Sequence, residues 1–63
     1  MNNHFKLENK RYLNAQDVAD MLEVSISMAY KIIWELNMEL EKEKYITIAG
    51  KISKKYFESK ICI

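Results

Sequence analysis

The sequence predicts a single, mainly α-helical domain with a small β-hairpin. Two amphipathic helical patterns follow each other with only three residues between them. A short run of β-branched and aromatic residues then precedes the one glycine of the chain. The chain has 63 residues, 49% of them hydrophobic and none of them proline, which is enough for one compact core but not for two.

The first helix is expected over residues 15–22. Asn14 is a favourable N-cap, and Asp17 stands three residues later, at the capping-box position. One face of this helix is apolar and consists of Ala15, Val18, Ala19 and Leu22. Residues 1–10 show no periodicity and are predicted to be a flexible arm, and residues 11–13 are predicted to be a short extended segment that begins the domain at 11–63.

The second helix is expected over residues 26–43, with Ser25 as its N-cap. Its apolar stripe repeats every three or four residues and contains Ala29, Ile32, Ile33, Leu36 and Leu40. Residues 23–25 join the two helices, and Val24 is expected to point into the core. Two helices joined by so short a turn are typical of a helix-turn-helix.

A wing is expected behind these helices, at about residues 45–52. Residues 45–48 have strand composition, Ala49 and Gly50 supply a turn, and residues 51–52 form the return strand. Ser53 then caps a last helix at about residues 54–62, in which Phe57 and Ile61 share a face. The predicted architecture is therefore a winged helix-turn-helix.

Composition argues against several classes of function. The chain has one cysteine, Cys62, and one histidine, His4, so no internal disulfide or His/Cys zinc site is expected. Neither residue has a catalytic partner in the pattern, and one glycine cannot build a phosphate-binding loop. We therefore expect a protein that is not an enzyme and has no cofactor or small-molecule substrate. We also expect a cytoplasmic location, because no membrane span or export signal is visible.

The exposed face of the second helix carries candidate DNA contacts. Ser25 and Ser27 are short hydrogen-bond donors, Tyr30 can donate to a phosphate, and Lys31 can neutralise a phosphate or read a guanine edge. Gln16, at the start of the first helix, is a candidate for the DNA backbone, and so are the wing lysines Lys51 and Lys54. Each also has a plainer interpretation: the serines as helix caps, Tyr30 as cover for the core edge, and the lysines as solubilising charge.

Two further side chains on that helix favour protein contact. Trp34 and Met38 lie off the apolar stripe and form a possible interface, although Trp34 is equally consistent with peripheral core. The net charge is only +1, and the second half of the helix is acidic, with Glu35, Glu39, Glu41 and Glu43. DNA binding therefore requires that positive charge be segregated from this acidic end.

Residues 12–33 resemble the signature of the excisionase-like, MerR-like winged helix-turn-helix DNA-binding family of mobile genetic elements. The matching features are the run Val18-Ala19-Asp20-Met21-Leu22, the pair Val24-Ser25, and the run Tyr30-Lys31-Ile32-Ile33. The hairpin and lysine-rich helix expected behind them are similar to that family's wing and closing helix. Where Glu23 stands, the family often has glycine, and a left-handed glutamate there costs about 1 kcal/mol.

The resemblance implies double-stranded DNA as partner, together with an integrase or another copy of the chain. It places Ser25, Ser27, Met28, Tyr30 and Lys31 on a recognition helix, with Lys51 and Lys54 on the wing and its exit. The predicted function is a DNA-binding protein of a mobile element, either an excision or recombination accessory factor or a transcriptional regulator. It would place the helix that begins at Ile26 in the major groove. The alternative is a protein-interaction module on the same fold, such as an antirepressor or an assembly partner.

Overall fold

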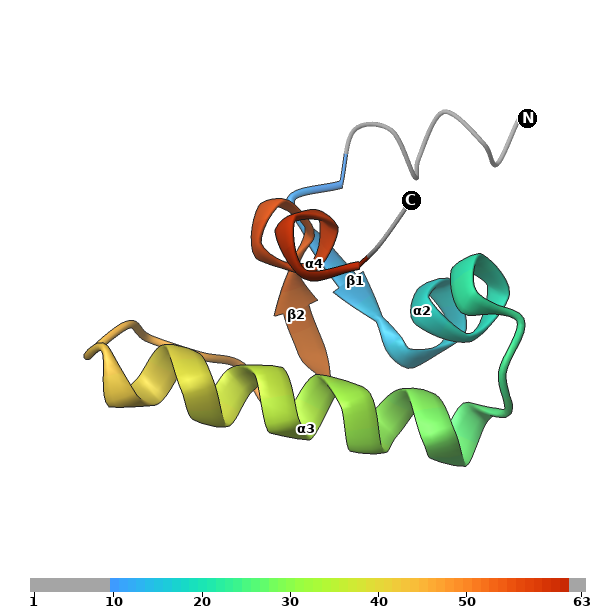
Figure 1. The fold of residues 1–63 in the computed structure, drawn as a ribbon, viewed down its shortest axis with the longest axis horizontal. Coiled ribbons are helices and arrows are strands. Elements are labelled where there is room, and N and C mark those ends of the chain that lie inside the picture. The colour runs from blue at the N-terminus through green and yellow to red at the C-terminus, as the bar shows by residue number, and fades with distance from the viewer. Residues whose placement is uncertain (1–9, 62–63) are drawn as a thin grey trace.

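The computed structural model describes residues 10–61, which form three helices and a two-stranded antiparallel sheet (Figure 1). The order is β1 (Tyr12–Asn14), α2 (Ala15–Leu22), α3 (Ile26–Lys42), β2 (Lys51–Ser53) and α4 (Lys54–Lys60). This confirms the predicted fold class. The flexible arm expected at residues 1–10 lies, apart from Lys10, outside the described residues, and so does Cys62.

The start of α2 is fixed by a complete capping box. The Asn14 side chain accepts a hydrogen bond from the Asp17 backbone amide at 2.9 Å, and the Asp17 carboxylate accepts one from the Asn14 amide at 3.0 Å. At the other end Glu23 adopts a left-handed conformation, with φ of 58°. The chain therefore leaves α2 abruptly, and α3 begins after two more residues.

The other two helices begin at the predicted serines. Ser25 accepts a hydrogen bond from the Met28 amide at 3.1 Å, and Ser53 accepts one from the Tyr56 amide at 3.2 Å. Each cap satisfies one of the amides that a helix start leaves without an intrahelical partner. The helix α3 ends one residue before the predicted bound, and α4 ends at Lys60, not at residue 62.

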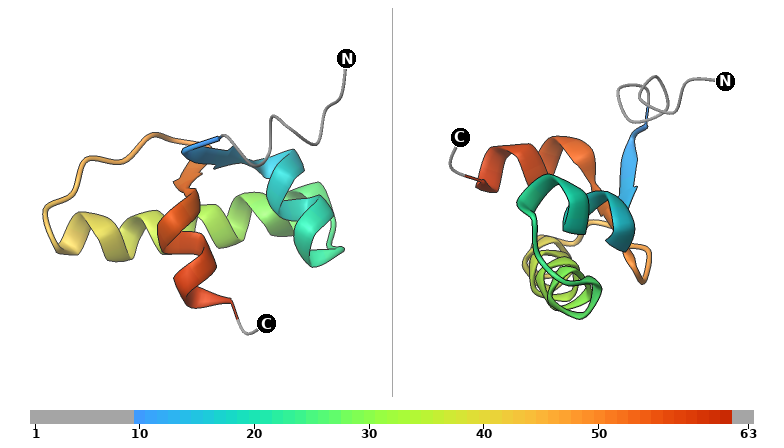
Figure 2. Two further views of the ribbon diagram at one scale, coloured as in Figure 1. Left: turned by 90° about the horizontal axis from the view of Figure 1, so that it is seen from above. Right: turned by 90° about the vertical axis from the view of Figure 1, so that its right-hand side faces the viewer.

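The core lies where α2, α3 and α4 meet the sheet. Its largest fully buried side chains are Phe57, Leu13, Ile33, Ile52 and Val18, and alanines at the helix contacts let the backbones approach. Figure 2 shows α4 crossing over α3, and Figure 1 shows β2 running from α3 to the start of α4. Each strand contributes one buried residue, because in the register Leu13 lies opposite Ile52.

The wing hairpin expected at residues 45–52 is not formed, because residues 45–48 make no strand. The partner of β2 is β1, with Asn14 opposite Lys51 and Tyr12 opposite Ser53. The turn at residues 48–51 is present, with a hydrogen bond of 3.0 Å from the Lys51 amide to the Ile48 carbonyl. A two-residue hairpin loop needs positive φ at its first central residue, which here is Ala49. Of the two central residues, Gly50 has positive φ, at 77°, and Ala49 does not. The segment at 43–50, called here the α3–β2 loop, therefore returns along α3 without pairing.

Candidate nucleic-acid interface

The first turns of α3 present most of the predicted DNA-contact residues to solvent. Ser25, Ser27, Met28, Tyr30 and Lys31 are all exposed, and Tyr30 keeps 54% of its surface accessible. The Ser25 oxygen is occupied by its cap, but the hydroxyl proton stays available for donation. Opposite them, Ala29 and Ile33 are buried, so α3 is fixed to the core by one side and accessible on the other.

The α3–β2 loop brings its turn against this exposed side. A Cβ atom built on Gly50 would lie 3.7 Å from Cε1 of Tyr30, so the turn lies beside the tyrosine ring. Lys51 follows directly and is exposed. The fold therefore brings a cation of β2 next to the recognition-helix candidates, although the predicted wing strand is missing.

One residue that the sequence did not indicate fixes this arrangement. Asn37 is buried, with 8% of its surface accessible, and is the one buried polar side chain within residues 10–61. Its amide Nδ2 donates to the Ile48 carbonyl at 3.2 Å and to the Lys51 carbonyl at 2.9 Å. Its position four residues after Ile33, inside the apolar stripe, was the available signal. Asn37 therefore fastens the turn to α3.

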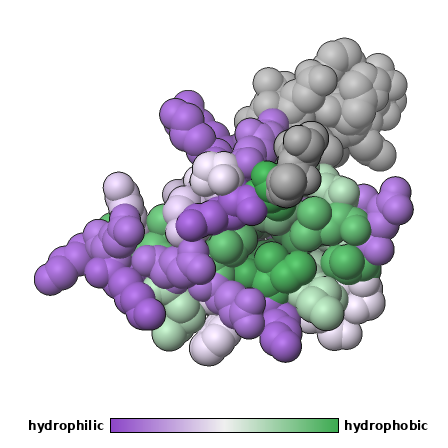
Figure 3. Space-filling view, in the orientation of Figure 1, coloured by the Kyte–Doolittle hydropathy of each residue, from purple (hydrophilic) through white to green (hydrophobic). Residues whose placement is uncertain are grey.

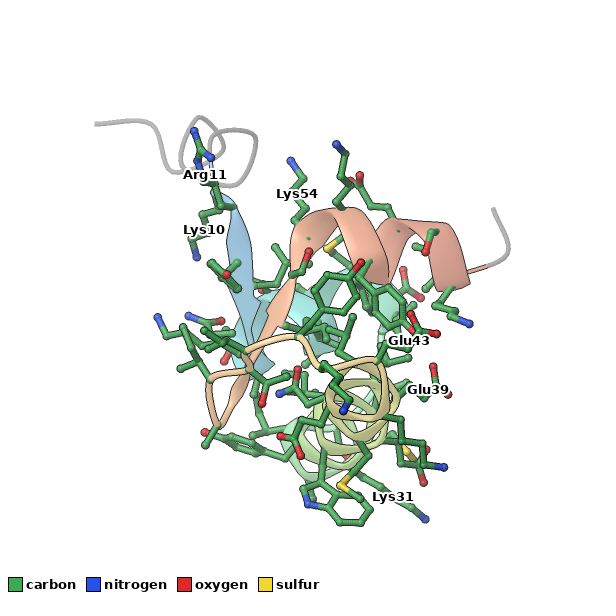
Figure 4. All side chains as sticks on the ribbon, turned by 90° about the vertical axis from the view of Figure 1, so that its left-hand side faces the viewer. Lys10, Arg11, Lys31, Glu39, Glu43 and Lys54 are labelled. Atoms are coloured by element: carbon green, nitrogen blue, oxygen red, sulfur yellow. The ribbon has the colours of Figure 1, made fainter. Side chains whose placement is uncertain are left out.

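Two of the predicted DNA contacts are placed differently from the rest. Gln16 is exposed, and its amide donates to the Asp20 carboxylate at 2.9 Å, one turn further along α2. Lys54 begins α4 and lies on the other side of the domain from Lys31, as Figure 4 shows with the view along α3. The structure therefore brings Lys51 beside the turn at Gly50, with its charge acting on Asp17 at the start of α2, whereas Lys54 lies away from Lys31.

Trp34 and Met38, the possible interface residues, follow Tyr30 on α3 at steps of four. They retain 62% and 39% of their surface and line a hollow of about 420 Å³ between α3 and the α3–β2 loop. Apolar exposure is high in the loop too, where Ile46 is 92% accessible. The tryptophan is thus an exposed side chain and not peripheral core.

Acidic residues are concentrated in the second half of α3, away from Ser25. Glu39 accepts a hydrogen bond from the Tyr56 hydroxyl at 2.7 Å, and Lys60 lies 3.7 Å from it. That bond, with burial and the charges of Glu39 and Glu43, raises the pKa of Tyr56 to about 12. Figure 3 shows this end of α3, at the left, as hydrophilic, whereas apolar side chains gather beside α2.

Positive charge also acts on the start of α2. Burial by itself raises the pKa of Asp17, but hydrogen bonds from Lys10 and the Asn14 amide and the charges of Lys10 and Lys51 outweigh it. The pKa of Asp17 therefore lies below its ordinary value. Lys10 Nζ is 2.7 Å from the carboxylate oxygen Oδ2.

Within residues 10–61 no three histidine, cysteine or carboxylate side chains are grouped closely enough to hold a metal ion. In the same part of the chain, every helix is too short or too polar to cross a membrane.

Comparison with known proteins identifies the family to which the chain belongs. No family model matches the chain, and no solved structure matches it. The ICEBs1 excisionase of Bacillus subtilis (strain 168) is 37% identical over 51 residues, which are 81% of this chain and 80% of that protein. At this identity over most of both lengths, the chain belongs to the family of the ICEBs1 excisionase.

Proposed function

We propose that this chain is a small DNA-binding accessory protein of recombination in a mobile element. The name of its relative, excisionase, supports a role in excision. In this proposal α3 enters the major groove by its first turns, and Lys51 contacts the adjacent backbone. The observation that carries the proposal is the position of the turn at Gly50 beside Tyr30, through which α3 and the start of β2 form one surface.

Roles follow from chemistry and exposure. Ser25 and Ser27 donate to phosphates or base edges, Tyr30 donates to a phosphate, and Lys31 pairs with a phosphate or a guanine edge. Met28 offers an apolar contact to a thymine methyl group. Gln16 is proposed as a backbone contact that exchanges its bond to Asp20 for one to DNA.

The test is a salt titration of binding to a fluorescent pool of short duplexes. Lys31→Ala is compared with Lys42→Ala, which removes an exposed lysine from the other end of α3. Each lost phosphate contact lowers the slope of log affinity against log salt by about 0.9, so we expect this reduction for Lys31→Ala alone. Absence of binding by the folded protein at ~50 mM salt, where backbone contacts are strongest, would exclude the proposed function.

A second candidate function is favoured by the exposed Trp34. A protein-interaction module, such as an antirepressor or an assembly partner of an integrase, would use the stripe of Tyr30, Trp34 and Met38, because aromatic residues and methionine are enriched in protein interfaces. Trp34→Ala separates the two functions. For this candidate the natural protein does not bind the duplex pool, and Trp34→Ala abolishes capture of the partner protein.

A further inference from the structure

A second basic surface lies on the side of the domain away from Lys31. Lys10, Arg11, Lys54 and Lys55 line a hollow of about 430 Å³, to which Glu58 contributes the one acidic side chain. These residues come from opposite ends of the described chain. The sheet brings them together, because the Lys54 amide donates to the Arg11 carbonyl at 2.9 Å where β1 begins. We call this surface the basic edge.

The basic edge faces away from Lys31 and borders the proposed DNA-contact surface of α3 and Lys51 at Lys10, because Lys10 and Lys51 both act on the Asp17 carboxylate. Figure 4 shows Lys10, Arg11 and Lys54 on one side of the domain and Lys31 on the other side of α3. The described part of the chain measures 38 × 23 × 23 Å, and the two sides are separated along one of the shorter axes. The major groove is only about 8.5 Å deep, so we expect that a straight duplex holding the first turns of α3 does not reach Arg11 and Lys54 on the far side of the domain.

Two of its four cations are available for a ligand. Lys10 pairs with Asp17, and Lys54 also takes part in an interaction within the domain. Arg11 and Lys55 are exposed, and neither forms an ion pair with another residue in 10–61. The surface therefore presents positive charge that the fold itself does not neutralise.

We propose that the basic edge binds the phosphate backbone of a second DNA segment, so that one copy of the protein bridges two stretches of duplex. This proposal rests on the proposed function, which supplies the first segment. Three of the four cations are lysines, which are depleted in protein interfaces but are common phosphate ligands. That composition favours a nucleic-acid backbone over an acidic protein as the occupant.

The test counts duplexes per protein. Native mass spectrometry is performed on the protein with two short duplexes of different mass, and complexes of one protein with both duplexes are measured. The doubly substituted variant Arg11→Glu with Lys55→Glu is compared with Lys42→Glu with Lys44→Glu, which makes the same change in charge at the end of α3. We expect the first variant to bind one duplex as the natural protein does. Its affinity for the second duplex should fall by roughly tenfold or more. The control variant keeps both.

Each outcome has a distinct meaning. If the natural protein binds one duplex and never two, the basic edge does not bind DNA and the inference is wrong. If bridging persists in Arg11→Glu with Lys55→Glu, the bridge is made through another surface or by two associated copies, and the inference is again wrong. If polyglutamate binds to the natural protein but not to that variant, and no second duplex binds, the occupant is an acidic protein and the inference is wrong. If no duplex binds at all, the proposed function fails first.

Discussion

Replacing Asn37 by alanine tests whether the α3–β2 loop is held by its two hydrogen bonds. The substitution removes the donor to the Ile48 and Lys51 carbonyls, which lies within the core side of α3. The Ile48 carbonyl keeps the bond from the Lys51 amide, so it is not left without a partner. Both bonds are part-buried, and the Lys51 carbonyl loses its Asn37 donor; an acceptor left without its partner costs about 1–3 kcal/mol, and with the second lost bond we expect the free energy of unfolding to fall by about 2–3 kcal/mol.

Urea denaturation followed by circular dichroism measures this change, with Glu35→Ala as the control. Glu35 is exposed on the same helix, and a surface substitution of that kind changes stability by less than about 0.5 kcal/mol. In a thermal scan 2–3 kcal/mol corresponds to a decrease in melting temperature of roughly 8–24 °C for a domain of this size. An Asn37→Ala variant as stable as the Glu35→Ala control would refute the role given to the two bonds.

The same variant tests whether Asn37 positions Lys51 for DNA. Affinity for the duplex pool is measured for Asn37→Ala, Lys51→Ala and the double variant, at a temperature where all are folded. If the bonds hold Lys51 in place, the effect of Lys51→Ala is smaller when Asn37 is already absent. Equal effects of Lys51→Ala in both backgrounds would show that the turn finds its position without Asn37.

Three further predictions follow from the caps and the shifted pKa values. Glu23→Gly should raise the free energy of unfolding by about 1 kcal/mol, because glycine adopts the left-handed conformation without strain; a thermal scan that shows no gain contradicts this. Because the pKa of Asp17 is lowered on folding, its contribution is complete above its ordinary value of 3.8 and is lost as the pH falls through the native value. Urea unfolding at about pH 5 and about pH 3 should therefore show a smaller decrease in Asp17→Asn than in the natural protein. The Tyr56 phenol, with a pKa of about 12, contributes stability below its ordinary value of 10.0 that is lost as the pH rises, and Glu39→Gln should lower the midpoint of its ultraviolet titration. Tyr56→Phe identifies that step, and an unchanged midpoint in Glu39→Gln would contradict the cause given.

The helices could be predicted because their signals are local. Asn14, Ser25 and Ser53 each cap the helix that follows, and a cap needs only an amide three residues away. The left-handed Glu23 was expected from the family resemblance, because glycine often stands at this position in that family. These features depend on near neighbours in the chain, so the sequence pattern was sufficient for them.

The prediction of a hairpin at residues 45–52 was wrong because strand pairing is not a local property. Residues 45–48 have the composition of a strand, but only a partner strand makes them one. The partner of β2 is β1, nearly forty residues earlier, and Leu13 opposite Ile52 completes the core on that side. With β2 already paired to β1, the loop uses other bonds: the Tyr45 amide donates to Leu40, and Thr47 donates to Glu41. Tertiary context therefore overrode composition.

The candidate site was predicted residue by residue but not as a surface. Exposure of Ser27, Tyr30 and Lys31 follows from the helical period. The separation of Lys54 from Lys31 does not, because it depends on the direction in which α4 leaves the sheet. The DNA contacts themselves stay predictions that the salt titration tests. The MerR-like part of the resemblance also stays a prediction.

Segregation of charge shows how a chain with a net charge of +1 can be proposed to bind a polyanion. Asp17, Asp20 and Glu23 lie on α2 and its C-cap, and Asp17 is paired with Lys10. Four of the nine acidic residues of the chain, Glu35, Glu39, Glu41 and Glu43, lie in the second half of α3 or directly after it, where Tyr56 and Lys60 bind Glu39 and join α3 to α4. That half would therefore remain outside the groove in the proposed complex, and its negative charge acts at the far end of a domain 38 Å long. Interactions between exposed charges are screened beyond about 8 Å at physiological salt. The first turns of α3 can thus attract phosphate although the whole chain is nearly neutral, and Glu39, which would repel DNA, serves instead to hold α3 to α4.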